Sequence, residues 1–337
     1  MNLDVLIPSL LVPAPFQTPQ TQIPPPVVPA IERLLARADR KTGLAATGPS
    51  GVFEVWGVNA PYPVAAVLAE YDGLEISTDG WMFAEPVHLV ADRDRLVMFS
   101  SHFLELDAAE SAALIVALNS HFADRGLQFY APTPERWYVR CNPTEIPSTT
   151  SPHSARRRAL VDSQPISKGA MDWRSLQNET QMLFFDHPVN DARQAKGKPA
   201  VSGVWFWGGG VQPQLTKPAY DLIVTDSPLA VQLAGKTGIG VKSLPWRPTE
   251  RGTGKVLAVI DSCSTFPLNL EFESWTREIE RLDRELFLPV AQALANGIIQ
   301  RLCIQVPDEE RRQTFEITRR NQLHRFWHST KPLSSYA

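Results

Sequence analysis

The sequence has few cysteines, and none are paired at the spacing of a metal or redox motif. Cys141, Cys263 and Cys303 are the three cysteines among 337 residues, and they stand far apart. A disulfide framework or a cysteine-based zinc site needs paired, closely spaced cysteines. We therefore expect three reduced thiols, as in a cytoplasmic protein.

The chain also lacks a long uncharged apolar run. A membrane helix needs about 18 or more consecutive apolar residues, and no uncharged stretch approaches that length. The apolar start carries Asp4, has no basic region and contains prolines at 8, 13 and 15, which do not suit a leader helix. These features predict a cytoplasmic protein with no membrane partner.

The chain also lacks a large excess of positive or negative charge. The 33 Lys and Arg and 36 Asp and Glu residues give a net charge of −3, so no basic field attracts nucleic acid. The basic run at 156–158 is more typical of a solvated loop. Nucleic acid is therefore not an expected partner.

Familiar catalytic signatures are absent too. The sequence has no G-x-S-x-G nucleophile elbow and no G-x-G-x-x-G fingerprint. The run 234–237 reads Ala-Gly-Lys-Thr, but Ala230 stands where a phosphate loop needs glycine. His324 and His328 are four residues apart and could chelate a metal on a helix, although Arg325 between them favours a surface or capping pair.

What the sequence does contain is an alternation of apolar strands and amphipathic helices. Such alternation favours an α/β fold with a mostly parallel sheet and helices on both faces. In the last predicted helix the apolar residues recur at three- and four-residue steps, and Pro289 is expected to bend or divide it. The expected strands are 3–7, 95–99, 127–130, 137–139, 201–207, 221–225, 256–261 and 302–306, and the expected helices are 31–38, 107–126, 173–185, 227–236 and 270–296. Asp107 followed by Glu110 predicts a capping box at the start of the helix 107–126.

Two stretches are rich in residues that interrupt regular structure. Residues 13–29 contain many prolines and predict a surface loop. Residues 143–167 are rich in Pro, Ser, Thr and Arg and predict a surface connection. The expected parts are therefore 1–142 and 168–337, or alternatively one continuous domain that contains both.

Three glycines follow the predicted strand at 201–207. At the carboxyl end of a parallel strand they would permit the close backbone approach with which open α/β sheets bind ligands. A tight turn that needs positive φ explains them equally well. The expected ligand crevice comprises Trp207, Gly208, Gly209, Gly210, Asp226, Asp261, Ser262 and Ser264.

Seven short stretches form an ordered set that is spread over nearly the whole chain. They are Ala84-Glu85-Pro86-Val87-His88-Leu89, Leu118-Asn119-Ser120-His121-Phe122, Arg136-Trp137-Tyr138, Asn178-Glu179-Thr180-Gln181-Met182, His187-Pro188-Val189-Asn190, Trp205-Phe206-Trp207-Gly208-Gly209-Gly210 and Leu323-His324-Arg325-Phe326-Trp327. Together they resemble the RpfE-type regulatory proteins of proteobacteria. That family is named for a locus linked to the regulation of pathogenicity factors, so the resemblance implies regulation and no particular chemistry.

A more distant resemblance covers residues 200–333. A strand ending in Trp-Phe-Trp-Gly-Gly-Gly at 205–210 is followed by further strands. The run from Ile279 to Pro289 then resembles a helix of the form I-E-x-x-D-x-x-x-x-P, with one more residue between Asp283 and Pro289. This order is similar to the archaeal-type cofactor-independent phosphoglycerate mutases of the alkaline-phosphatase superfamily. The resemblance implies their α/β fold.

The chemistry that this resemblance implies requires two divalent cations held by several Asp and His side chains, with a Ser or Thr nucleophile. The segment 261–267 offers one carboxylate, Asp261, and no histidine. Asp308-Glu309 stands where the family has Asp-His, and the first strand ends in Ile7-Pro8-Ser9 in place of Asp-Gly. We therefore expect a degenerate scaffold without a cofactor. The alternative to a protein without a cofactor is one that binds Mn or Zn, and Asp261 and Asp308 are then the remaining candidate ligands.

The residues leave two functional hypotheses open. The first is a non-catalytic or weakly catalytic regulatory protein that binds an unidentified protein or small molecule. The alternative is a divergent metal-dependent phosphoglycerate mutase, or another phosphotransferase or phosphatase, with Ser262, Ser264 or Thr265 as nucleophile. Residues of these types are more often turn residues or helix caps.

Overall fold

The chain forms two compact units in the computed structural model, Met1–Val58 with Leu215–Ala337, and Asn59–Gln214. The segment expected as a boundary, 143–167, falls inside the second unit, because strands from both sides of it pair in one sheet. The structure describes residues 1–11, 24–44, 50–92, 95–156, 163, 165–167, 171–248, 254–264, 272–307, 311–325 and 327–337.

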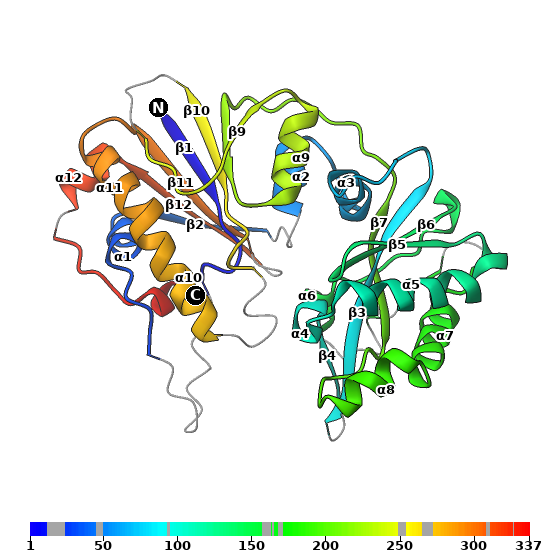
Figure 1. The fold of residues 1–337 in the computed structure, drawn as a ribbon. Helices are drawn as coiled ribbons and strands as arrows, with labels where there is room; N and C mark the ends of the chain where they lie inside the picture. Colours follow the sequence, from blue (N-terminus) through cyan, green and yellow to red (C-terminus); the bar gives the residue numbers. More distant parts are fainter. Residues whose placement is uncertain are drawn as a thin grey trace. The chain divides into compact units, whose positions relative to one another are not determined.

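The first unit contains a seven-stranded sheet in the order β2-β12-β11-β1-β10-β8-β9 (Figure 1). The five neighbours from β11 to β9 are parallel, as expected, whereas β12 and β2 are antiparallel strands that the sequence patterns did not predict. The strands are β1 (Asn2–Leu6), β2 (Asp39–Leu44), β8 (Leu222–Thr225), β9 (Gly240–Lys242), β10 (Lys255–Val259), β11 (Arg301–Pro307) and β12 (Arg311–Thr318).

Helices cover both faces of this sheet. Leu3 of β1 packs in one core with α1, α10 and α11. Leu6 points to the opposite face and contacts α2, since a Cβ at Gly51 would lie 3.3 Å from it. The Trp56 indole after α2 donates to Thr237 at the end of α9, at 3.0 Å. The helices are α1 (Pro29–Ala36), α2 (Ser50–Val55), α9 (Pro228–Lys236), α10 (Phe272–Leu282), α11 (Leu288–Ala295) and α12 (Arg319–His324), with a 3₁₀ turn at Leu333–Tyr336.

The long helix expected at 270–296 is divided. A π-turn at Asp283–Phe287 joins α10 to α11, just before Pro289, whose missing N–H and ring disfavour an uninterrupted helix. The apolar residues of the predicted stripe are buried at Trp275, Ile279, Leu282, Leu286, Val290 and Leu294. Within the described ranges, no helix has the length and apolar character to cross a membrane.

The second unit has its own five-stranded sheet, ordered β4-β3-β6-β5, with β7 also paired to β3. All of these described pairings are antiparallel. The expectation that β7 belongs to the parallel sheet is therefore wrong, because an apolar run predicts a buried strand without giving its direction or partner. The strands are β3 (Gly80–Asp92), β4 (Arg95–Phe99), β5 (Gln128–Thr133), β6 (Arg136–Cys141) and β7 (Gly203–Gly210).

Helices also cover both faces of the second sheet. Met82 of β3 packs in a core with α5 and α7, whereas the adjacent Phe83 faces α3 beside Gly208. α5 starts with the predicted capping box, in which Asp107 accepts the Glu110 N–H at 2.8 Å and Glu110 accepts the Asp107 N–H at 3.1 Å. The helices are α3 (Val64–Tyr71), α4 (Ser101–Leu104), α5 (Ala108–His121), α6 (Pro152–Arg156), α7 (Trp173–Phe185) and α8 (Pro188–Ala195), with 3₁₀ turns at Ala123–Arg125 and Pro143–Glu145.

Candidate functional site

Several of the expected site residues lie together at the carboxyl edge of the parallel strands. Asp226 follows β8 and Asp261 follows β10, and these strands are parallel neighbours. β1, on the other side of β10, ends at the same edge with Ser9. Open parallel sheets bind ligands at this edge. The structure thus brings Asp226 and Asp261 together, as their positions after predicted strands indicated.

Asp226 organises the loop after β10. Its Oδ1 accepts the backbone N–H of Asp261 at 2.6 Å, and its Oδ2 accepts the N–H of Ser262 at 3.3 Å. The side chain is exposed. One carboxylate therefore fixes the backbone that carries both Asp261 and the candidate nucleophile Ser262.

Asp261 accepts hydroxyl hydrogen bonds from two loops. Ser264 donates to Oδ1 at 2.7 Å, and Ser227 donates weakly to Oδ2 at 3.5 Å. Although part of the side chain reaches solvent, desolvation by the atoms around it and the nearby Asp226 charge raise the pKa of Asp261, against the two hydroxyl bonds. Ser227 was expected only as the start of a helix, and its position directly after a strand-end Asp is the signal that could have identified it.

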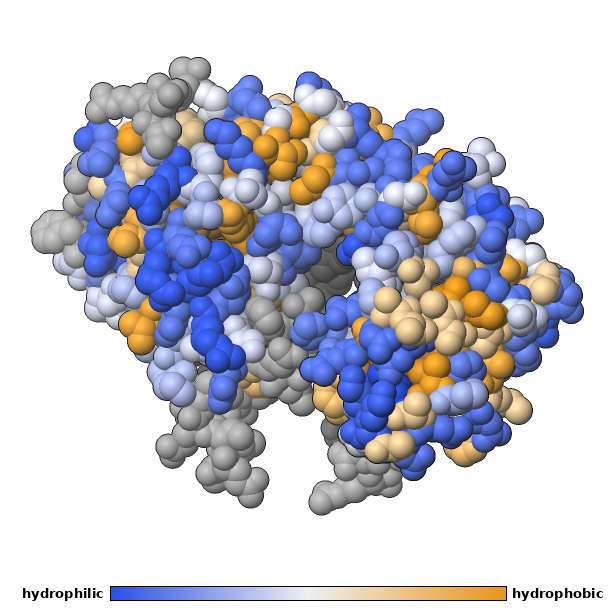
Figure 2. All heavy atoms as spheres, in the orientation of Figure 1, coloured by the Kyte–Doolittle hydropathy of each residue, from blue (hydrophilic) through white to orange (hydrophobic). Residues whose placement is uncertain are grey.

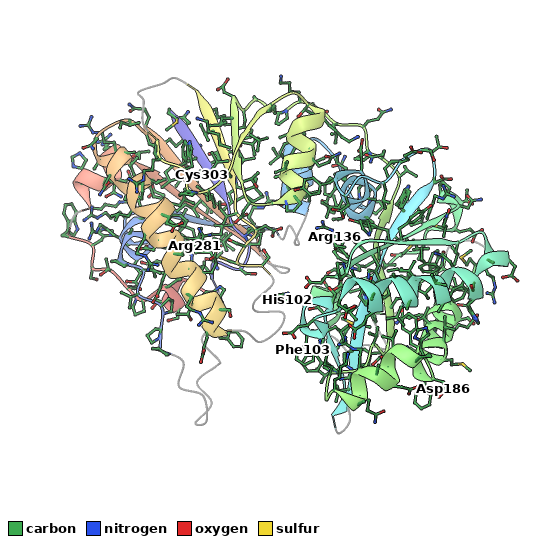
Figure 3. The ribbon with its side chains drawn as sticks, in the orientation of Figure 1. His102, Phe103, Arg136, Asp186, Arg281 and Cys303 are labelled. Atoms are coloured by element: carbon green, nitrogen blue, oxygen red, sulfur yellow. The ribbon has the colours of Figure 1, made fainter. Side chains whose placement is uncertain are left out.

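Helix α10 supplies an ion pair beside this loop. Arg281 donates to both oxygens of Glu278, at 2.8 and 2.6 Å, and to Glu285 at 2.7 Å (Figure 3). The Arg281 bonds, and more weakly the Ser262 hydroxyl, lower the pKa of Glu278 against its desolvation. Burial, together with the charges of Glu278 and Asp226, raises the pKa of the Cys263 thiol. Cys263 is therefore protonated at neutral pH and is not an activated nucleophile.

Ser9, after β1, has an uncommon backbone conformation. Its φ is 58°, a region that residues other than glycine rarely occupy. The Trp275 indole donates to the Ser9 carbonyl at 2.9 Å, and the next residue, Leu10, is fully buried. These contacts hold the strand-end turn against its strain. Serine has no marked preference for positive φ, so the sequence carries no signal for this turn.

Trp207 and the three glycines lie elsewhere. They belong to β7 in the second unit, so the crevice expected from the sequence is divided between two units. A Cβ at Gly210 would lie 2.4 Å from Pro63, and one at Gly209 would lie 2.7 Å from a side-chain carbon. Gly208 has a φ of +65°, which favours glycine. The close approach that these glycines permit is made by side chains of the same unit.

The remaining candidates have structural roles or lie outside the described residues. Thr265 and Asp308 are in the latter group. α12 ends at His324, and His328 lies beyond that end with its Nδ1 3.1 Å from the Ala36 carbonyl. Arg325 donates to the next two carbonyls, of residues 37 and 38. His328 and Arg325 thus meet the free carbonyls at the end of α1, where the Arg325 cation is also favourable to the helix dipole.

The described side chains at the carboxyl edge do not match a two-metal centre. Asp226 and Asp261 are its two carboxylates, and both already accept hydrogen bonds from loop groups. Throughout the ranges that the structure describes, no group of three or more His, Cys, Asp and Glu side chains could hold a metal ion. This donor set is smaller than the several Asp and His ligands that a pair of divalent cations requires.

Parts of the sequence are similar to proteins named as phosphoglycerate mutases. No protein-family model matches the chain. A stretch of 134 residues, 38% of the chain, is 27% identical to a probable 2,3-bisphosphoglycerate-independent phosphoglycerate mutase of Geobacter sulfurreducens. A stretch of 146 residues, 42% of the chain, is 27% identical to 2,3-bisphosphoglycerate-independent phosphoglycerate mutase 2 of Methanothermobacter thermautotrophicus. The chain is distantly related to the cofactor-independent phosphoglycerate mutases.

This relationship is partial in extent. The matched stretches span 33% and 35% of the length of the two mutases. Among solved structures, the cofactor-independent phosphoglycerate mutase of Thermoplasma acidophilum matches with a TM-score of 0.42 and 14% identity, over 94% of this chain and 89% of that one. The PH0037 protein of Pyrococcus horikoshii matches with a TM-score of 0.48 and 12% identity, over 94% and 87%. The resemblance to RpfE-type regulatory proteins stays a prediction.

Proposed function

We propose that this protein is a cytoplasmic regulatory protein on a phosphoglycerate-mutase-like scaffold, and that its carboxyl-edge site binds a ligand without mutase chemistry. The observation that supports this most is the way Asp226 and Asp261 are used. Three of their oxygens accept hydrogen bonds of 2.6 to 3.3 Å from the loops around them, and the fourth is 3.5 Å from Ser227. Carboxylates that hold loops in this way are not arranged to neutralise a phosphoryl transition state through bound metal.

The regulatory part of the proposal rests on the RpfE-type resemblance, and the scaffold part rests on the distant mutase homology. The site offers two exposed carboxylates, those of Asp226 and Asp261, on loops fixed by hydrogen bonds. Such a surface suits a partner that presents hydrogen-bond donors, either a small molecule or a segment of another protein.

Metal content and turnover together test the proposal. The full chain is incubated with Mn²⁺ or Zn²⁺, passed through gel filtration and analysed for bound metal, and interconversion of 2- and 3-phosphoglycerate is measured on the same samples. We expect substoichiometric metal and no turnover above background. About two tightly held ions per chain, as a two-metal site requires, would contradict the proposal.

A matched pair of variants assigns any turnover to the site. Asp261→Asn removes a carboxyl-edge charge, whereas Asp221→Asn makes the same change at the start of β8, where Asp221 accepts the Lys255 N–H at 2.7 Å. Turnover lost in Asp261→Asn and kept in Asp221→Asn would show catalysis at the carboxyl edge. The non-catalytic proposal would then be wrong.

The alternative, a divergent phosphotransferase or phosphatase, is favoured by one contact. The Ser264 hydroxyl donates to Asp261 at 2.7 Å, and the pKa of Asp261 is raised mainly by desolvation. A carboxylate with a raised pKa beside a hydroxyl can act as its general base. Under this alternative Ser264→Ala abolishes phosphatase activity on a generic phosphomonoester, whereas Ser262→Ala keeps it.

A further inference from the structure

A groove lies in the first unit, on the face of the sheet that α1, α10 and α11 cover. It runs between the start of α1 and the π-turn that divides the long helix. Its volume is about 420 Å³, within the range of pockets that hold small organic molecules. The outer surface of α10 is mostly hydrophilic (Figure 2), but two walls of the groove are apolar. Val27 and Leu288 line it and are 74% and 42% exposed. π-turns are frequent at functional sites, because they displace side chains from the regular helix surface.

The two acidic side chains of the groove already have partners. Asp283, 3% exposed, accepts the N–H groups of Ile31 at 2.7 Å and Ala30 at 3.3 Å. Glu280 accepts the N–H of Val27 at 2.9 Å. Because these donors lie at the amino end of α1, the helix dipole also compensates both carboxylates.

The two arginines of the groove differ from the two acids in their hydrogen bonding. Arg33 on α1 and Arg284 on the π-turn both line it, and both are exposed. Among the described residues, neither has a hydrogen bond or ion pair to a protein group. Burial raises the pKa of Asp283, and the charges of Arg284 and Arg33 oppose that rise, so both guanidinium groups act on the same buried carboxylate.

We propose that this groove binds a small organic carboxylate, a molecule with an apolar body and one carboxylate group. The body would cover Val27 and Leu288, and the carboxylate would pair with Arg33 and Arg284, whose planar N–H groups match carboxylate geometry. The occupant carries a negative charge because both acids of the groove already accept backbone N–H bonds, whereas within the described ranges the two arginines still have their N–H donors available. This site is distinct from the carboxyl edge and does not depend on the function proposed for it.

Calorimetric titration of the full chain with 4-phenylbutyrate tests the site, and the uncharged 4-phenylbutyramide is the matched probe. We expect saturable one-to-one binding of the carboxylate, at least about tenfold tighter than the amide, because hydrogen bonds to a charged group are the stronger ones. No saturation at millimolar concentrations, or equal affinity for acid and amide, would overturn the proposal.

Variants separate the two halves of the site. Arg33→Gln with Arg284→Gln should weaken carboxylate binding by about tenfold or more and leave amide binding unchanged. Leu288→Ser should weaken both probes alike. Arg277→Gln is the control, since Arg277 lies on α10 outside the groove and bonds Ser274. Carboxylate affinity that the double arginine variant leaves unchanged, in protein that melts like the wild type, would also overturn the proposal.

Discussion

The carboxylate of Asp72 gathers three donors in the second unit. Arg136, labelled in Figure 3, donates from Nε at 2.7 Å and from a terminal nitrogen, and the Tyr138 hydroxyl donates at 2.6 Å. The Asp72 side chain is 5% exposed. These contacts tie the end of α3 to β6, and they show how a single buried charge joins a helix to a sheet.

Replacing Asp72 therefore has a large expected cost. Asp72→Asn should lower the free energy of unfolding of the second unit by about 3 kcal/mol, because Arg136 loses its counterion in a partly buried position. Asp79→Asn is the control, since the Asp79 side chain is 39% exposed and lies 3.8 Å from Arg140, and its loss should cost less than about 1 kcal/mol. Urea unfolding followed by circular dichroism measures both, and similar losses would refute the argument.

The three thiols should be unreactive in the folded protein. Burial raises the pKa of Cys141 to about 12 and also raises the pKa of Cys263 and Cys303, and all three are free and buried. A disulfide-exchange reagent at pH 8 should label none of them in native protein and all three in denaturant. Rapid labelling of native protein would refute this.

The same thiols make stability depend on alkaline pH. Since the folded state keeps protons that unfolded thiols release near their ordinary pKa of 9.0, it binds more protons than the unfolded state above that pH. The free energy of unfolding should therefore fall as the pH rises through 9. Urea midpoints measured from pH 7.5 to 10 check the direction, and a rising midpoint would contradict it.

Contacts between residues can be predicted from the sequence when the partners are close together along the chain. The capping box of Asp107 and Glu110 was predicted because its partners are three residues apart. The bonds of Asp72 were not, because their partners lie 64 and 66 residues away. Asp226 and Asp261 form an intermediate case. Their proximity followed from two predicted strand ends, although the hydrogen bonds between their loops did not.

At the scale of elements, the helices with a clear apolar stripe were predictable, whereas others such as α3 and α8 were not predicted. The partners of the strands were not predictable either. α7 spans the predicted 173–185, because its apolar spacing and the Asp172 cap are local signals. β7 was also found, but in the wrong sheet. Its apolar run and terminal glycines suit a strand of either direction, and the antiparallel pairing with β3 depends on residues about 120 positions away.

The glycines of β7 should tolerate little enlargement. Gly210→Ala should destabilise the second unit by about 1–3 kcal/mol, because its Cβ would lie 2.4 Å from Pro63. Gly235→Ala, in helix α9 with no atom within 4 Å of its Cβ, should stabilise the first unit by about 0.5–1 kcal/mol. Denaturant unfolding of both variants tests the contrast. If Gly210→Ala leaves the free energy of unfolding unchanged, close packing does not explain this glycine, and the prediction that it lines a ligand site would again be the better explanation.

At the scale of the whole molecule, the second unit is an insertion in the first. The chain leaves the first unit after Val58 and returns at Leu215. The Thr216 N–H donates to the Trp56 carbonyl at 2.9 Å, so the two connecting segments run beside each other. The composition of 143–167 suggested a boundary, but loops inside a domain have the same composition.

An inserted unit with its own core should fold alone. We expect residues 59–214, expressed as a separate protein, to show a cooperative thermal transition and a dispersed amide spectrum, because this unit has its own apolar core. The first unit with a short Gly-Ser linker in place of 59–214 should also fold. A polypeptide 59–214 without a cooperative transition would show that the two units depend on each other.

The pairing of β1 also affects how the chain is made. Leu3 pairs with Val256 on one side and Leu302 on the other, so β1 leaves the ribosome about 250 residues before the first of its two partner strands. At about 5–20 residues per second, this wait lasts on the order of 10–50 s. The whole inserted unit is synthesised in that interval. An apolar strand that stays unpaired during synthesis can be bound by chaperones. The yield of folded protein in cells should therefore fall when chaperones are depleted, even if the folded protein is stable.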